Sequence, residues 1–165
     1  MYRLTSSLCA VAAILAGSTA APTARELGNN LLITNLELDY AESGNTSIRF
    51  NIQDEATVAN YTASCTATFA SRPTPTGEAF ACSTQAFQAS IDGWNSYDDF
   101  RLHFSHSYKD PAIGPPGMDY VTVFANADIA DPDQIDCEDG ESSTQCLEPT
   151  GTVIKAPITS AIAKK

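Results

Sequence analysis

The 165-residue sequence has few histidines and lacks the short motifs that mark many metal centres and nucleophilic active sites. It contains two histidines, His103 and His106, whose spacing of three on a strand would point the rings to opposite faces, so that they could not share a metal ion. There is no Gly-x-Ser-x-Gly motif and no Cys-x-x-Cys pair. We expect His106 to be a packed, hydrogen-bonded core residue. The sequence therefore predicts no catalytic, cofactor-binding or metal-binding residue, and a protein that is not an enzyme.

Basic residues are also scarce. Nine Lys and Arg stand against 20 Asp and Glu, which gives a formal net charge of −11. A surface of that sign repels phosphate backbones and anionic headgroups, so nucleic acids and membranes are not expected partners.

Long hydrophobic runs are nearly missing. The one clear run, Leu8 to Ala16, follows Arg3 and precedes the small residues Ser18-Thr19-Ala20. It is well short of the ~20 residues that a membrane-spanning helix needs. This order predicts a signal peptide at residues 1–20, followed by a polar leader at 21–30 and a single domain at 31–165. We therefore expect a secreted, extracellular protein.

Helical periodicity is absent too, and alternation of apolar and polar residues takes its place. From Tyr61 to Phe69, apolar or small side chains alternate with Thr and Ser, the pattern of a half-buried β-strand. Turn residues separate further strands of this kind, which is typical of an all-β fold: a compact antiparallel β-barrel or sandwich. In the first strand we expect Thr34, Leu36, Leu38 and Tyr40 to share one face. The expected strands cover residues 34–40, 48–52, 61–69, 80–82, 87–91, 100–108, 120–129 and 152–158.

Four cysteines remain once Cys9 is removed with the signal peptide: Cys65, Cys82, Cys137 and Cys146. An even number in a secreted chain predicts two disulfides, for which three connectivities are possible. The strand–loop–strand pattern around residues 61–82 favours a disulfide between Cys65 and Cys82. Because all four would be used internally, we expect a monomer or a non-covalent dimer.

Two sequons, Asn45-Thr46-Ser47 and Asn60-Tyr61-Thr62, predict N-glycosylation at Asn45 and Asn60. Seven acidic residues between Asp128 and Glu141 suggest a calcium loop at first sight, but they do not fit the EF-hand register. We expect a solvated acidic loop pinned by a disulfide, with a weak calcium site as the alternative.

Aromatic residues in loops are candidates for partner binding. Trp94 and Tyr97 follow the turn signal Asp92-Gly93, and residues 109–117 contain three prolines that would stiffen a second loop. We predict Trp94 and Tyr97 as exposed anchors for a partner. The alternative is a pair of aromatic rings that cover the end of the barrel.

The order of these features resembles a family of fungal proteins, the domain typified by the major allergen of Alternaria alternata. The resemblance rests on the signal peptide, an Ile48-x-Phe50-x-Ile52-x-Asp54 strand, the cysteines at 65 and 82 and the late Cys137…Cys146 pair. It implies a secreted β-barrel with the disulfides Cys65–Cys82 and Cys137–Cys146.

The same resemblance implies a non-enzymatic fungal effector, elicitor or allergen whose partner is a host extracellular protein or a small ligand. Two alternatives remain at this stage: a carrier of a small hydrophobic ligand, and an extracellular enzyme acting on polymers.

Overall fold

The computed structural model describes residues 29–56 and 58–163; the expected signal peptide and residues 21–28 of the expected leader lie outside this part of the chain. The described residues form an all-β, curled antiparallel sheet, as the alternation predicts. They contain no helix, and therefore none that is long and apolar enough to cross a membrane. The strands are β1 (Asn30–Ala41), β2 (Asn45–Asp54), β3 (Thr62–Ala70), β4 (Ala81–Cys82), β5 (Phe87–Ser96), β6 (Asp99–Lys109), β7 (Tyr120–Ala130), β8 (Asp136–Asp139), β9 (Ser143–Leu147) and β10 (Ile154–Ala163).

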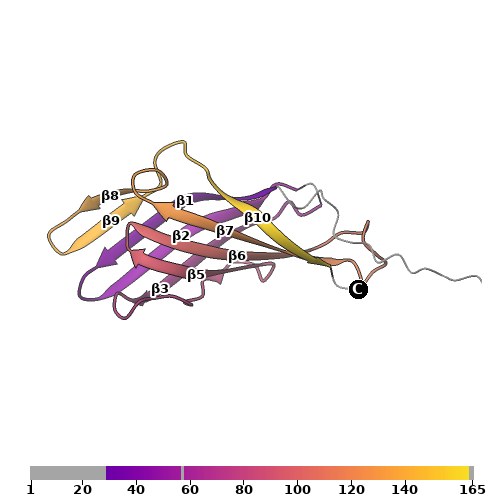
Figure 1. Ribbon diagram of the computed structural model, residues 1–165, viewed down its shortest axis with the longest axis horizontal. Coiled ribbons are helices and arrows are strands. Elements are labelled where there is room, and N and C mark those ends of the chain that lie inside the picture. Colours follow the sequence, from indigo (N-terminus) through magenta and orange to yellow (C-terminus); the bar gives the residue numbers. More distant parts are fainter. Residues whose placement is uncertain (1–28, 57, 164–165) are drawn as a thin grey trace, which may run out of the picture.

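Eight strands lie side by side in the order β4-β3-β2-β1-β10-β7-β6-β5 (Figure 1). β10 lies between β1 and β7, so the last strand joins the first three strands to the β5–β6–β7 meander. The remaining two strands, β8 and β9, form a hairpin that pairs with β1 through β9. The expectation of a loop here was wrong: the acidic residues from Asp136 to Asp139 belong to a strand.

A short segment, residues 77–82, connects the two edges of this sheet. Its first part bonds to β5: Gly77 N donates to Ile91 O at 2.8 Å, Ile91 N to Glu78 O at 2.9 Å, and Phe80 N to Ala89 O at 2.9 Å. Its last part is β4, which pairs with β3. Because both edges bond to one segment, the sheet is curled round a single interior, and backbone groups that an open sheet would expose are paired.

Apolar side chains alternate inward along each long strand and fill that interior. On β6, the row from Phe100 to Tyr108 is buried at every second residue, as predicted, and β7 contributes its alternate residues from Val121 to Ile129. β7 lies between β10 and β6, and its first residue, Tyr120, is 41% exposed.

The inward face of β1 changes parity halfway along the strand. Leu31 and Ile33 are buried in its first part, whereas Leu36 and Leu38 are buried in its second. The change occurs at Asn35, whose φ of 54° lies in the left-handed region and marks a bulge against β2. The prediction of one uninterrupted inward row beginning at Thr34 was therefore wrong, because a bulge moves every later side chain to the other face.

Residues 92–96 also differ from expectation. The sequence predicts a turn there because of Asp92-Gly93, but β5 continues through Ser96, with a register shift between Ile91 and Gly93. The chain reverses at Tyr97–Asp98 instead.

Candidate functional site

Loops 55–61, 83–86 and 110–119 connect strands at the same end of the barrel, the end at which β10 finishes. We call it the loop end; it lies at the right of Figure 1, beside the mark C.

Near the loop end, His106 and Asp54 form a buried pair. His106 Nδ1 lies 2.8 Å from Asp54 Oδ2, and the two side chains are 0% and 2% exposed. An ionised carboxylate can only accept, so in that state His106 Nδ1 is the donor. The expectation of a packed, hydrogen-bonded histidine is confirmed. Asp54 was missed as its partner, although it has the same parity as Ile48, Phe50 and Ile52, which places it on the inward row of β2.

Aromatic rings surround the His106 imidazole. Phe87 stacks on it with ring centroids 4.0 Å apart, and Tyr61 meets it edge-on at 5.6 Å. Tyr108 lies at 5.3 Å. Among the described residues, His106 Nε2 has no hydrogen-bond partner. Tyr61 itself is 49% exposed, so it forms the outer wall of this aromatic surround.

Asp54 also organises loop 55–61. Its Oδ1 accepts from Ala56 N at 2.9 Å, and its own N–H donates to Tyr61 O at 3.0 Å. The pair therefore connects the barrel interior to the shape of an exposed loop. A general base must reach a proton of its substrate, and a fully buried imidazole behind a tyrosine does not, so this pair is suited to holding the loop rather than to catalysis.

A second polar feature lies at the bulge of β1, where the strand that pairs with β1 changes from β10 to β9. β1 pairs with β10 at Asn30–Ile33 and with β9 at Glu37–Ala41. At the bulge between these regions, Glu148 Oε2 accepts from Leu36 N at 3.2 Å, and Glu148 N donates to Leu36 O at 2.8 Å. The carboxylate also bonds the Asn35 backbone. Glu148 thus supplies hydrogen bonds that a neighbouring strand would otherwise give to β1 at the bulge. Nothing in the sequence around residue 148 predicts this role.

Burial raises the pKa of Glu148, and the two backbone N–H groups act in the opposite direction. The residue borders an open hollow of about 420 Å³ that Glu37 also lines. Glu37, however, is bound to Arg49, and Glu148 Oε1 is buried without a partner among the described residues.

Trp94 and Tyr97 pack against the barrel rather than extending from it. Trp94 belongs to β5, is partly buried, and stacks on Phe100 at 5.2 Å with Phe69 edge-on at 5.8 Å. Tyr97 stacks on Tyr40 at 4.9 Å, and burial and the nearby Asp139 raise its pKa. The location of Trp94 in a loop was wrong. Partner binding by this pair stays a prediction, but the packing favours the alternative of rings that cover the barrel end.

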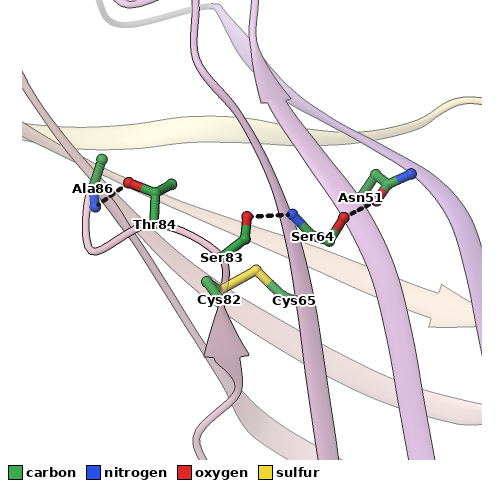
Figure 2. Close-up of a disulfide and its surroundings, with 7 residues drawn as sticks. All are labelled: Asn51, Ser64, Cys65, Cys82, Ser83, Thr84 and Ala86. Atoms are coloured by element: carbon green, nitrogen blue, oxygen red, sulfur yellow. Dashed lines mark hydrogen bonds between the residues drawn. A yellow bond between two sulfur atoms is a disulfide. The ribbon is translucent and has the colours of Figure 1, made fainter.

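Both disulfides have the expected pairing, Cys65–Cys82 and Cys137–Cys146. The first joins β3 to β4 at the closing segment, where Ser83 N donates to Ser64 O at 2.8 Å. Figure 2 shows this disulfide together with the bond that Ser64 N donates to Ser83 Oγ at 3.1 Å. The second crosses the β8–β9 hairpin. Two internal disulfides are consistent with an extracellular, oxidising compartment.

The sequon asparagines Asn45 and Asn60 are both exposed. Asn45 begins β2, and Asn60 lies in the loop between β2 and β3. In the acidic stretch, Asp131, Asp133 and Glu138 are exposed to solvent. Over residues 29–56 and 58–163, no three His, Cys, Asp or Glu side chains are grouped so that they could hold a metal ion.

Several large apolar side chains remain exposed at or near the loop end. Met118 is 49% exposed and Tyr120 41%, and Ile162 near the end of β10 is 61% exposed. Tyr120 pairs with Lys109, and Ile162 pairs with Thr122 two residues along β7.

No family model, no curated protein and no solved structure matches the chain.

Proposed function

We propose that this chain is a secreted interaction protein of the fungal effector or elicitor type, which binds an extracellular partner without chemical turnover. The observation that carries the proposal is the contrast between its interior and its outside. Apolar side chains and a buried polar pair fill the barrel, while Met118, Tyr120 and Ile162 are displayed on its surface. Exposed apolar groups near one another mark interaction surfaces more often than catalytic ones.

The loop end is ordered before any partner arrives. Asp110 N donates to Asp119 O at 2.7 Å and closes loop 110–119, and Asp119 Oδ1 accepts from Gly117 N at 2.9 Å. Gly117 has a φ of 94°, which a residue with a Cβ rarely adopts. A loop held in this way loses less conformational entropy on binding, so more of its contact energy contributes to affinity.

The polar groups with unusual surroundings support binding rather than turnover. His106 is enclosed by aromatic rings, and the Glu148 carboxylate is bonded to the backbone of β1. Both are used to hold backbone in place. The fold and the disulfide pairing also agree with what the resemblance to the Alternaria allergen-like domain implies, and that resemblance supports the effector or allergen interpretation.

Affinity capture from plant extracellular material tests the proposal. The purified protein would be immobilised and exposed separately to apoplastic fluid and to a cell-wall fraction, with reduced and alkylated protein as the control. We expect saturable retention of a partner that is recovered chemically unchanged. A recovered partner with cleaved bonds, or no saturable retention from either fraction, would contradict the proposal.

A further inference from the structure

Three neighbouring strands carry an outward surface that differs in character from the rest of this acidic molecule. We call it the aromatic face, and define it by the outward side chains of β6, β7 and β10: His103, Ser107, Tyr120, Thr122, Phe124 and Ile162. On β6 and β7 these residues alternate with the buried rows; on β10, Ile162 pairs with Thr122 beyond the register shift between Ile158 and Ser160. All of them therefore point away from the core.

Cross-strand pairs show how the aromatic face is built. Its central rungs on β6 and β7 are Ser107–Thr122, Ser105–Phe124 and His103–Asn126. Ser107 Oγ and Thr122 Oγ1 lie 2.8 Å apart, and His103 Nδ1 lies 2.8 Å from Asn126 Oδ1. β10 adds Ser160 beside Phe124 and Ile162 beside Thr122. The surface therefore presents hydroxyl, amide and imidazole groups with apolar groups set between them.

Two aromatic residues, Tyr120 and Phe124, follow one another along the outward face of β7. Tyr120 and Phe124 are four residues apart on a strand, which separates their Cα atoms by roughly 13 Å. Lys109 Nζ lies 5.2 Å from the Tyr120 ring centroid, and the His103 ring lies nearly parallel to Phe124 with centroids 6.1 Å apart. Lys109 thus packs against the Tyr120 ring, and His103 packs against the Phe124 ring.

The charge of the protein distinguishes between the classes of molecule that could bind to the aromatic face. No carboxylate lies on the three central rungs, although the chain has 20 acidic residues and a net charge of −11. A basic partner would bind the acidic hairpin and turns instead, and a second copy of the chain would bring another −11. An uncharged partner fits these carboxylate-free rungs on a molecule whose net charge repels anions.

We propose that the aromatic face binds an uncharged linear polysaccharide, an inference that rests on the proposed function and names its partner class. The C–H faces of sugar rings pack on aromatic rings, and their hydroxyls bond to Ser, Thr, Asn and Lys side chains. Neither sequon asparagine lies on the strands that carry the aromatic face: Asn45 begins β2, and Asn60 lies in the loop between β2 and β3.

The β2–β3 surface provides an internal comparison. Its outward residues include Ser64, Thr66 and Thr68 on β3 and Asn51 on β2, which are also hydroxyl and amide groups. It has no outward aromatic ring among the described residues of these two strands. If hydroxyl groups alone were sufficient for polysaccharide binding, the β2–β3 surface would bind as well as the aromatic face. The proposal requires the Tyr120 and Phe124 rings, so only the aromatic face should bind.

Co-sedimentation with insoluble polysaccharides tests the proposal. The full secreted protein would be mixed with microcrystalline cellulose, with chitin and with an insoluble β-1,3-glucan, and polygalacturonate gel would serve as the anionic control. We expect saturable pelleting with at least one uncharged polymer, little change between low and high salt, and no retention by polygalacturonate. Tyr120→Thr should weaken pelleting about tenfold, and Tyr120→Thr/Phe124→Thr should abolish it.

Matched variants keep the test decisive. Leu147→Thr removes a similarly exposed apolar side chain (43%) from β9, and Thr66→Ala removes a hydroxyl from the β3 surface; both should pellet like the wild type. If the double variant fails to fold, Tyr120→Thr alone decides, because that residue is largely exposed.

Absence of pelleting with all three uncharged polymers would overturn the proposal, as would pelleting unchanged by Tyr120→Thr or lost in high salt. A change of oligomeric state in Tyr120→Thr without an effect on pelleting would assign the face to self-association instead. Saturable capture of a protein from apoplastic fluid, without polysaccharide binding, would leave the proposed function standing and refute only this inference.

Discussion

At the scale of single residues, the polar groups inside the barrel hold backbone in place. Asp54 is the clearest case, because its two carboxylate oxygens bond the His106 ring on β6 and the Ala56 amide in loop 55–61. A buried charge of this kind is tolerated only while its partners remain.

Asp54→Ala should therefore lower the free energy of unfolding by about 3–5 kcal/mol, since removing one member of a buried pair leaves the other uncompensated. Asp54→Asn keeps an acceptor and should cost less. Urea unfolding measures both. The matched control is Asn126→Ala, which removes the partner of the outward-facing His103 and should cost within about 1 kcal/mol. Equal midpoints for the two Ala variants would show that Asp54 does not have this role.

Trp94 gives a second prediction at this scale. Its ring packs between Phe100 and Phe69, so Trp94→Ala should destabilise the domain by about 2–4 kcal/mol, the range expected for a partly buried large aromatic. The sequence alone predicts a nearly unchanged thermal midpoint. Tyr120→Ala, which removes an exposed aromatic from β7, is the control and should shift the midpoint little. An unchanged midpoint in Trp94→Ala would restore the interpretation of an exposed anchor.

At the scale of strands, the alternation of residues was sufficient to predict most of the sheet. It identified the β6 and β7 rows, the β1–β2 hairpin and the β3–β4 connection, because each inward row is directly readable at a period of two. It failed where the backbone departs from that period. The bulge at Asn35 has no compositional mark, and Asp92-Gly93 is a turn dipeptide that here lies at a bulge within β5.

Contacts between residues far apart in the sequence could not be predicted either. Glu148 bonds a backbone amide 112 residues away, and Asp54 bonds a histidine 52 residues away. Spacing along the chain gives no measure of such contacts. The disulfide pairing could be predicted, because a hairpin and a family resemblance each constrained it.

The Glu148 contact predicts a pH dependence. Because burial raises its folded pKa above the ordinary value of 4.5, the native state binds the proton more readily than the unfolded state. Stability should therefore fall as pH rises from about 4.5 through the raised pKa. Glu148→Gln, which keeps an acceptor and cannot ionise, should flatten that slope. Denaturant midpoints measured across this range would show it; an unaltered slope would mean that another group is responsible.

Glu148→Ala separates the hydrogen bonds from the charge. It leaves the Leu36 and Asn35 amides without their acceptor, so it should cost about 1–3 kcal/mol at any pH. If Ala and Gln variants were equally stable, the bulge would not depend on this side chain.

The two disulfides should differ in their effects. Each closes a short loop and should contribute up to about 3 kcal/mol by restricting the unfolded chain. Cys65–Cys82 additionally fixes the segment that joins both sheet edges, whereas Cys137–Cys146 lies in a hairpin attached to β1 alone. The double Ala variant at 65 and 82 should therefore lose more stability in urea unfolding than that at 137 and 146. The reverse order would contradict a closing role for residues 77–82.

At the scale of the whole molecule, the described structure is a barrel that is closed by one short segment, filled with apolar side chains, and negatively charged. Its buried polar groups organise the backbone, and its exposed large apolar side chains include Met118, Tyr120 and Ile162 at or near the loop end and Leu147 on β9. Binding and turnover make different demands on such a scaffold, because turnover requires reactive groups that a substrate can reach.

Calorimetric titration tests the central claim, binding without turnover, most directly. The purified protein would be titrated with the extracellular polysaccharide or protein that it retains, and the heat flow followed after each injection. The account predicts heats that decline to the dilution value as the site saturates, with heat flow returning to baseline between injections. A heat flow that continues after injection, in proportion to the amount of protein, would show turnover and contradict the account.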